Sequence, residues 1–346
     1  MSMMHASGVN DAAGAAVVPP TVSLMRWVLV ATLPGIATMS YFFGLGVISN
    51  VLLAAALGVA LEAAVLRLRK RPIRKTLDDS SALLTGVLLG VSLPPASPWW
   101  LIGVGMIAAI VVGKQLYGGL GHNPFNPAMV GYALLLVSFP TYMTLWAPPQ
   151  ELISSGLWAQ ITGTMPTAQL DSLSGATPLD AFKHKGEAIL ASEFWATNPL
   201  PDGTLSAWRW VALAWLAGGG LLLVKRVISW HIPVAMLGSV LILATLFYLS
   251  DPSHFASPIF HLLTGATLFG ALFIATDPVS AATSRRGKLI YGAGIGALVI
   301  IIRTFGGYPD AVAFAVLLMN LCVPLLDLYS VPRPTGHPKS TRGEQP

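Results

Sequence analysis

Two long stretches without charge constrain the fold of this chain most. Residues 80–113 contain no Asp, Glu, Lys or Arg over 34 positions, and residues 115–150 contain none over 36. About 20 apolar residues are enough for a helix to cross a bilayer, so each stretch must cross more than once. With 54% apolar and 10% charged residues, the composition is that of a polytopic membrane protein.

The sequence predicts an all-α protein of about ten transmembrane helices, because apolar runs of helical length follow one another along most of the chain. Several runs are short or broken by Gly and Pro, which is tolerated where neighbouring helices shield the freed backbone groups. The runs lie at about residues 27–43, 46–66, 81–93, 98–117, 128–146, 208–224, 232–249, 258–275, 289–302 and 310–327.

The positive charges predict the orientation of these helices. When loops are assigned alternately to two sides, 16 of the 20 Lys and Arg residues fall on one side, including the dense run at 67–75. Cytoplasmic loops carry an excess of Lys and Arg. We therefore expect a mobile cytoplasmic tail at 1–23, a transmembrane domain at 24–330, an outer-face loop at 147–207 and a cytoplasmic tail at 331–346. The other side keeps Lys183, Lys185, Arg209 and Arg303.

A short sequence that occurs twice suggests that the transmembrane domain is duplicated. Leu-Leu-Thr-Gly occurs at 83–86 and again at 262–265, in spans that the predicted topology runs in opposite directions. Two inverted five-helix repeats, at about 24–146 and 208–330, would leave such a trace. Binding sites are then expected near the repeat interface, where spans are interrupted.

Several function classes find no support in the residues. The net charge of +5 arises from basic loops beside apolar runs, a topology signal rather than a nucleic-acid footprint. One cysteine, Cys322, cannot build a disulfide framework or an iron-sulfur cluster from this chain alone, and we expect it to be a small core residue. No nucleotide-binding glycine motif, catalytic group or metal-ligand set is predicted.

Residues 171–180, within the longest polar segment, admit two compatible interpretations. In the first, Thr177 caps a helix, with Pro178 at the first helical position and Asp180 at the third. In the second, the Thr177 hydroxyl is the attachment point of a phosphate-bearing cofactor, and Gly175 and Ala176 leave room for an approaching enzyme. A phosphoryl group at a helix N-terminus would face free N–H groups.

The same three residues, Gly-Ala-Thr, recur at 265–267 in an apolar setting. We expect Thr267 to pack or to hydrogen-bond within its own helix. The second copy shows that the three residues alone do not define an attachment site; the surrounding segment must also be polar and exposed.

Two connections on the predicted cytoplasmic side are unusually polar, at 121–127 and 276–287. Asn123, Asn126 and Asp277 within them are either ordinary turn and cap residues or the lining of a second cofactor site or ion gate. Glu62 and Asp327 lie near helix ends, so a chain of buried carboxylates for protons is not expected. Ion passage would then need other subunits.

The motif Asp171-x-x-Ser174-Gly175-Ala176-Thr177 resembles the flavinylation sequence of the membrane subunits called RnfD and NqrB, and residues 123–129 and 276–278 also resemble theirs. The resemblance covers about residues 22–330 and is closer to RnfD in length. It implies an FMN joined through its phosphate to Thr177 by a separate flavin transferase, which would recognise Asp171, Ser174, Gly175 and Ala176.

The same resemblance implies a setting for the chain. Such complexes, in the bacterial inner membrane, pass electrons between ferredoxin and NAD through several flavins and iron-sulfur centres, coupled to sodium or proton movement. Their partners include a second flavinylated subunit and iron-sulfur membrane subunits. A fold like that of urea transporters, and a second, noncovalent flavin such as riboflavin, are also implied. The alternative is a small-solute channel or transporter of that fold, without redox activity.

Overall fold

The computed structural model describes residues 21–149, 175–186, 189–197, 200–308 and 310–330. Within these residues every regular element is a helix, and the sole β-type contact is an isolated antiparallel bridge between Trp146 and Gly175. Seven of the helices are long and apolar enough to cross a membrane. The protein is therefore an all-α polytopic membrane protein, as predicted.

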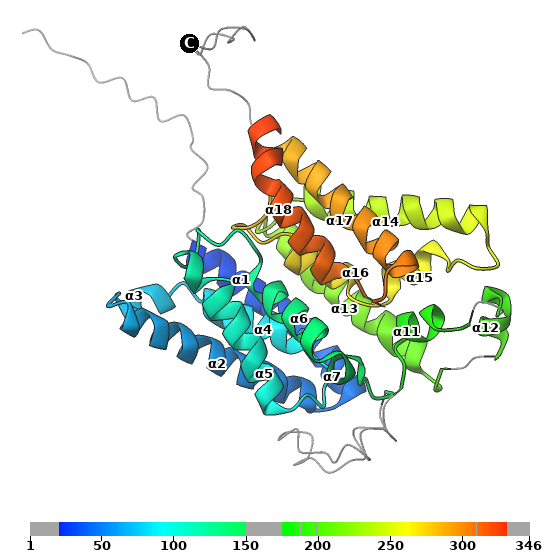
Figure 1. Ribbon diagram of the computed structural model, residues 1–346, viewed down its shortest axis with the longest axis horizontal. Helices are drawn as coiled ribbons and strands as arrows, with labels where there is room; N and C mark the ends of the chain where they lie inside the picture. The colour runs from blue at the N-terminus through cyan, green and yellow to red at the C-terminus, as the bar shows by residue number, and fades with distance from the viewer. Residues whose placement is uncertain (1–20, 150–174, 187–188, 198–199, 309, 331–346) are drawn as a thin grey trace, which may run out of the picture.

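The described helices form two halves that lie side by side, blue to green and yellow to red in Figure 1, with two short helices between them in sequence. The first half contains α1 (Thr21–Phe43), α2 (Gly46–Leu68), α3 (Ile73–Leu77), α4 (Ser81–Ser92), α5 (Trp99–Ile107), the π-helix η1 (Ala108–Val112), the 3₁₀-helix η2 (Gln115–Tyr117), α6 (Pro127–Ser138) and α7 (Pro140–Thr144). The short helices are α11 (Pro178–Lys183) and α12 (Ala191–Thr197). The second half contains α13 (Thr204–Val224), α14 (His231–Ser250), α15 (Pro258–Leu263), α16 (Thr267–Phe269), the π-helix η3 (Gly270–Ile274), α17 (Arg285–Phe305) and α18 (Val312–Ser330).

The ten predicted apolar runs coincide with helices, but the helices are not ten uniform spans. Helices α4 and α6 have only 12 residues each. The run at 258–275 is split into α15, α16 and η3, with Gly265 at φ +63° in the break. Broken spans occur at membrane depth where surrounding protein or a cavity accepts the freed backbone groups. The number of crossings stays a prediction.

Glycines bring the helices into close contact. A Cβ atom at Gly86 of α4 would lie 2.5 Å from a backbone oxygen of α2, and one at Gly296 of α17 would lie 2.3 Å from a backbone oxygen of α14. Gly218 of α13 would meet a backbone oxygen of α1 at 2.1 Å, which joins the two halves. Small residues at such crossings let helix backbones approach, the main source of packing where lipid provides no hydrophobic drive between helices.

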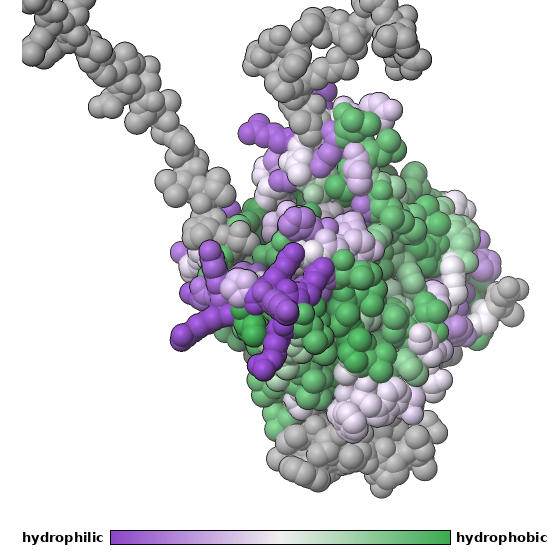
Figure 2. All heavy atoms as spheres, turned by 60° about the vertical axis from the view of Figure 1, so that its left-hand side comes forward, coloured by the Kyte–Doolittle hydropathy of each residue, from purple (hydrophilic) through white to green (hydrophobic). Residues whose placement is uncertain are grey.

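Most Lys and Arg residues lie at helix ends or in the turns between helices. Arg69 and Arg71 donate to the carbonyl oxygens of Gln115 (2.7 Å) and Gly118 (2.9 Å), which join the basic run to the turn after η1. Figure 2 shows hydrophilic side chains projecting beside a broad hydrophobic surface. Which end faces the cytoplasm stays a prediction.

Two sequence expectations differ from the structure, and a third is not tested by it. Helix α1 begins at Thr21, so the helical region starts before residue 24; residues 1–20 and 331–346 lie outside the described part. Cys322 is exposed on α18, so the prediction of a core residue is wrong. The two Leu-Leu-Thr-Gly segments differ locally, since the first lies within α4 and the second crosses the end of α15. The inverted repeat therefore stays a prediction.

Candidate functional site

Thr177 is the N-cap residue of α11. Its Oγ1 accepts a hydrogen bond from the Asp180 N–H at 3.2 Å, and Pro178 takes the first helical position. This confirms the capping predicted from the Thr-Pro-Leu-Asp pattern. Thr177 is half-buried and Ala176 is exposed, so the threonine lies at the boundary between solvent and the protein interior.

Gly175, two residues before Thr177, makes a backbone contact with Trp146. Gly175 N–H donates to Trp146 O at 2.7 Å, the bridge noted above. A Cβ atom on Gly175 would lie 3.2 Å from Pro148 Cγ, tighter than ordinary packing. The absence of a side chain at Gly175 therefore allows its close contact with the 146–148 segment. Asp171 and Ser174, the other residues of the predicted motif, lie outside the described residues.

Thr177 lines a cavity between the two halves, which we call the threonine cavity. Its empty volume is about 1080 Å³, including the part that opens to solvent. Helices α1, α4, α6, α13, α16 and α18 contribute to its wall. The aromatic lining residues are Tyr132, Trp146, Trp208, Trp215 and Phe269, and the polar ones include Ser92, Thr144, Thr177, Asp180 and Asp310.

This lining suits a flavin. Cofactor sites are mostly apolar and aromatic, with a few polar groups that fix orientation. Trp146 and Trp208 meet edge to face, with ring centroids 5.1 Å apart, and offer flat surfaces to an aromatic ring. A phosphate ester on the Thr177 hydroxyl would place the attached ring beside this cavity.

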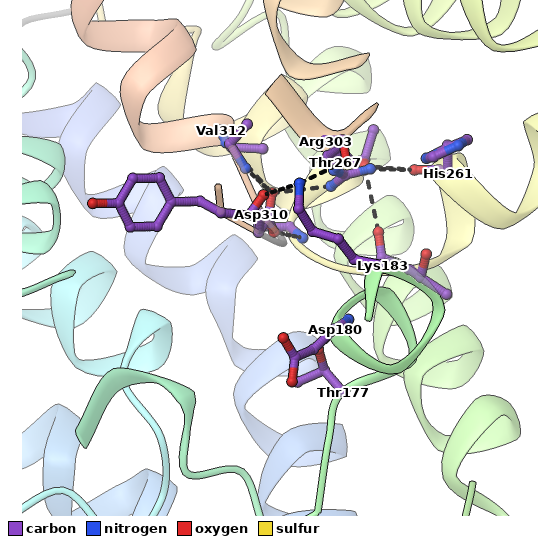
Figure 3. A network of polar contacts seen from close by, with 12 residues as sticks. Thr177, Asp180, Lys183, His261, Thr267, Arg303, Asp310 and Val312 are labelled. Atoms are coloured by element: carbon purple, nitrogen blue, oxygen red, sulfur yellow. Dashed lines mark hydrogen bonds and ion pairs between the residues drawn. The ribbon is translucent and has the colours of Figure 1, made fainter. Parts of the chain in front are cut away.

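Asp310, which lines the cavity, forms an ion pair with the buried Arg303, as Figure 3 shows. Asp310 Oδ1 accepts from Arg303 at 3.0 Å, and its Oδ2 accepts from the Ala266 N–H at 2.7 Å. Arg303 also donates to His261 O at 2.9 Å, and its side chain is 1% exposed. Because Asp310 lines the cavity, the arginine balances a negative charge there and ties together α15, α16, α17 and α18.

Lys183, the last residue of α11, reaches across to the end of α17 (Figure 3). Its Nζ donates to the carbonyl oxygens of Ile302 (3.3 Å), Arg303 (2.9 Å) and Tyr308 (3.1 Å). Burial lowers the pKa of the Lys183 amine, and the Asp180 carboxylate opposes part of this shift. The amine is therefore held chiefly by carbonyl dipoles.

A second cavity, of about 730 Å³ empty volume, brings Asn123, Asn126 and Asp277 together; we call it the asparagine cavity. Asn126 Nδ2 donates to Ile274 O at 3.3 Å, and the Asn126 N–H donates to Asn320 Oδ1 at 3.2 Å. Asn123 Oδ1 is buried without a hydrogen-bond partner among the described residues. An acceptor of this kind is costly to bury unless a ligand or water satisfies it.

The two cavities lie toward opposite ends of α1 and approach each other at α6 and η3, where Pro127 and Phe273 line the asparagine cavity and Met129 and Ile274 line the threonine cavity. In α1, Met25 lines the asparagine cavity and Met39 the threonine cavity, a separation of roughly 20 Å at about 1.5 Å per residue. Aromatic rings separate them: Trp215 and Phe269 face the threonine cavity, and Phe273 faces the other. The Trp215 ring centroid lies 4.5 Å from that of Phe269 and 5.3 Å from that of Phe273.

A buried charged group at the asparagine cavity was missed by sequence reasoning. Lys114 Nζ lies 2.7 and 2.8 Å from the two carboxylate oxygens of Glu62, and both side chains are 1% exposed. Lys114 also donates to Ser81 Oγ at 2.6 Å, and Gln115 donates to Glu62 at 2.7 Å. A lone Glu within the apolar run at 46–66 was the available signal, since such a residue needs a partner.

The second Gly-Ala-Thr copy has a different environment. Thr267 is 0% exposed and begins α16, after the break at Gly265, rather than lying inside a continuous helix. Its hydroxyl donates to His261 O at 2.7 Å. The burial of Thr267 confirms that it packs, but the bond predicted within its own helix is wrong, because His261 belongs to α15 and the chain breaks before α16.

Fold and cavities together define a polytopic membrane protein with one buried site near each end of its helices. A profile described as the NQR2, RnfD, RnfE family matches residues 18–336. Curated relatives, each named as a subunit of an ion-translocating oxidoreductase complex, include one from Vibrio vulnificus strain YJ016, 48% identical over 339 residues, covering 92% of this chain and 96% of the relative. Another, from Cronobacter sakazakii, is 50% identical over 336 residues, covering 92% and 95%. The chain belongs to the NQR2, RnfD, RnfE family, which confirms the resemblance seen in its sequence.

Proposed function

We propose that this protein is a membrane subunit of an ion-translocating ferredoxin:NAD oxidoreductase complex of the Rnf type, relaying electrons through an FMN esterified to Thr177. The observation that carries the proposal is the position of Thr177: half-buried, on a short helix, and lining an aromatic cavity between the two halves. The printed names of the relatives support the coarser part, a subunit of an ion-translocating oxidoreductase complex.

In this proposal the chain's own residues bind and orient the cofactor. FMN supplies one- and two-electron chemistry when bound. Trp146, Trp208 and Phe269 exclude water from the cavity and orient a flat ring, and Asp310 with Arg303 sets the charge at its wall. The chain has no dehydrogenase site of its own.

Attachment needs a flavin transferase. The ester forms between phosphorus and Thr177 Oγ1 as the leaving group departs from an activated flavin donor, and the hydroxyl proton passes to the transferase or to water. Asp171, Ser174, Gly175 and Ala176 serve recognition, so Asp171→Ala should lower labelling without removing the acceptor oxygen.

The asparagine cavity is proposed to hold a second, noncovalent flavin such as riboflavin. Asn123, Asn126 and Asp277 supply amide and carboxylate groups for the polar edge of a ring, and the unpartnered Asn123 Oδ1 calls for a donor from a ligand. If these residues instead gate an ion, the purified protein should hold no flavin beyond the one on Thr177.

The chain is proposed to lie in the bacterial inner membrane, with both termini in the cytoplasm and Thr177 at the outer face. Partners are a second flavinylated subunit and iron-sulfur membrane subunits. A flavin on the half-buried Thr177 would exchange electrons with a carrier outside the membrane.

A redox titration tests the function. The full chain, produced with a flavin transferase, should show a flavin that is reversibly reduced by dithionite and reoxidised, and Thr177→Ala should lose one flavin equivalent. The purified chain alone should not oxidise NADH at an enzymatic rate. Solute uptake into liposomes by a flavin-free chain would instead establish the channel or transporter alternative.

A further inference from the structure

Helix α11, which begins with Thr177, is too short to hold its own position. It has six residues, whereas isolated helices shorter than about 12–15 residues are marginal in water. Among the described residues, the chain before it contributes one bridge, from Gly175 to Trp146. Within this described part, the contacts that α11 makes with other helices hold Thr177 over the cavity.

Those contacts are of two kinds. Leu179 is buried against Gly265, where an added Cβ atom would approach Leu179 Cδ1 to 2.4 Å, and Phe182 packs on Phe260 with ring centroids 5.6 Å apart. These apolar contacts hold the helix against α15. The polar contact is Lys183, whose three carbonyl partners lie 119, 120 and 125 residues further along the chain.

The geometry at Lys183 is that of a complete ammonium site. An ammonium group has three N–H donors, and three carbonyl oxygens receive them. Ile302 O and Arg303 O belong to the last turn of α17, where the helix dipole is negative. Ile302 O also accepts from the Gly306 N–H at 2.8 Å, so Lys183 is its second donor. The positive charge of Lys183 and its three carbonyl acceptors together define a single position for the C-terminal end of α11.

We propose that Lys183 is a positioning residue, which locks α11 against the end of α17 and so holds the flavin on Thr177 in the threonine cavity. This inference rests on the proposed function. It assigns Lys183 no part in the ester itself, because the acceptor oxygen of Thr177 remains when Lys183 is changed. Without the hydrogen bonds of Lys183, the flavin ring should stay attached to Thr177 but move within the threonine cavity and out of it.

The test uses the full chain, produced with a flavin transferase and purified in detergent, as wild type, Lys183→Met, Lys183→Arg and Lys185→Met. Lys185 is the matched control, because its amine donates to Ile189 O within its own segment and lies over the Phe182 ring. The lifetime and anisotropy decay of flavin fluorescence are measured. Tryptophan quenches excited flavin on contact, so the wild type should be strongly quenched and immobile.

Lys183→Met should keep the covalent flavin, lengthen its mean lifetime several-fold and speed its anisotropy decay. Lys185→Met should match the wild type, and Lys183→Arg, which keeps the charge and several donors, should restore most of the quenching. Should Lys183→Met fail to fold, Lys183→Gln, with two amide donors, should give an intermediate lifetime.

Three results discriminate further. A wild-type lifetime and anisotropy in flavin-bearing Lys183→Met, or in Lys183→Gln where only that variant folds, would overturn the proposal. Loss of the covalent label from folded Lys183→Met alone would assign Lys183 to transferase recognition and would also overturn it. Absence of covalent flavin from the wild type as well would refute the function proposed for Thr177, a separate failure.

Discussion

The chain contains Gly-Ala-Thr twice, and the structure places the two copies in opposite environments at one cavity. Thr177 is half-buried, and its oxygen accepts the capping hydrogen bond of α11. Thr267 is fully buried, and its hydroxyl already donates a hydrogen bond to His261 O. Gly265 and Ala266 of the second copy line the same cavity as Thr177.

This difference shows why identical residues do not have identical chemistry. A modifying enzyme needs a hydroxyl that it can reach, on a segment that can be presented to it. The second copy is bound into the network of Arg303 and Asp310, whereas the first lies on a short helix at the boundary with solvent. Substitutions in each copy, and in the residues that support it, test whether this contrast holds.

The largest effect on stability is expected from Arg303→Met, which dismantles the support of the second copy. Removing one partner of a buried ion pair typically costs about 3–5 kcal/mol, and the lower end applies here because Asp310 is 24% exposed and keeps its backbone donors. Denaturant unfolding in detergent measures it. The exposed pair of Arg26 and Asp78 is the control, and Arg26→Met should cost less than about 1 kcal/mol. Equal losses of unfolding free energy in Arg303→Met and Arg26→Met would show that the hydrogen bonds of Arg303 do not stabilise the segment at 265–267.

The next largest difference in the free energy of unfolding is expected between Gly265→Ala and Gly175→Ala. Gly265 has φ +63°, and its Cβ would meet Leu179 and Asp310, so Gly265→Ala should cost about 2 kcal/mol or more. Gly175 has no positive φ, and its nearest neighbour would be Pro148 at 3.2 Å, so Gly175→Ala should cost about 1 kcal/mol or less. The same unfolding assay ranks them. A reversed order would mean that the break before α16 is not held as described.

The smallest effects are expected from the threonines themselves. Thr177→Val removes a helix cap, worth about 1 kcal/mol. Thr267→Val removes one buried donor, also about 1 kcal/mol, while His261 O keeps its bond from Arg303. Similar stabilities for the two variants would let any difference in flavin content be assigned to chemistry rather than to folding. A loss of more than about 3 kcal/mol of unfolding free energy in either variant would mean that its flavin content also reflects misfolding.

Local patterns in the sequence were enough for some of this structure. The cap at Thr177 could be predicted because its partners, Pro178 and Asp180, are neighbours in the chain. Helix type and the membrane class follow from long uncharged runs. The polar loops containing Asn123, Asn126 and Asp277 could be singled out by composition, and their convergence on one cavity needed the fold.

Other features depend on partners far along the chain. Lys183 is one of few basic residues in its segment, and nothing near it indicates the carbonyl groups of α17 that bind it. The pair of Glu62 and Lys114 spans 52 residues, and Lys114 looked like a loop cation. Cys322 was misjudged because an apolar run in a membrane protein has lipid-facing as well as core-facing positions.

The most direct test of the account is whether flavin stays on the denatured polypeptide. The chain and its variants are produced with a flavin transferase, separated on a denaturing gel and viewed under ultraviolet light. The wild type and Thr267→Ala should give a fluorescent band at the mass of this chain, and Thr177→Ala should give none. Fluorescence that survives Thr177→Ala and disappears in Thr267→Ala would contradict the assignment of the flavin to the half-buried copy.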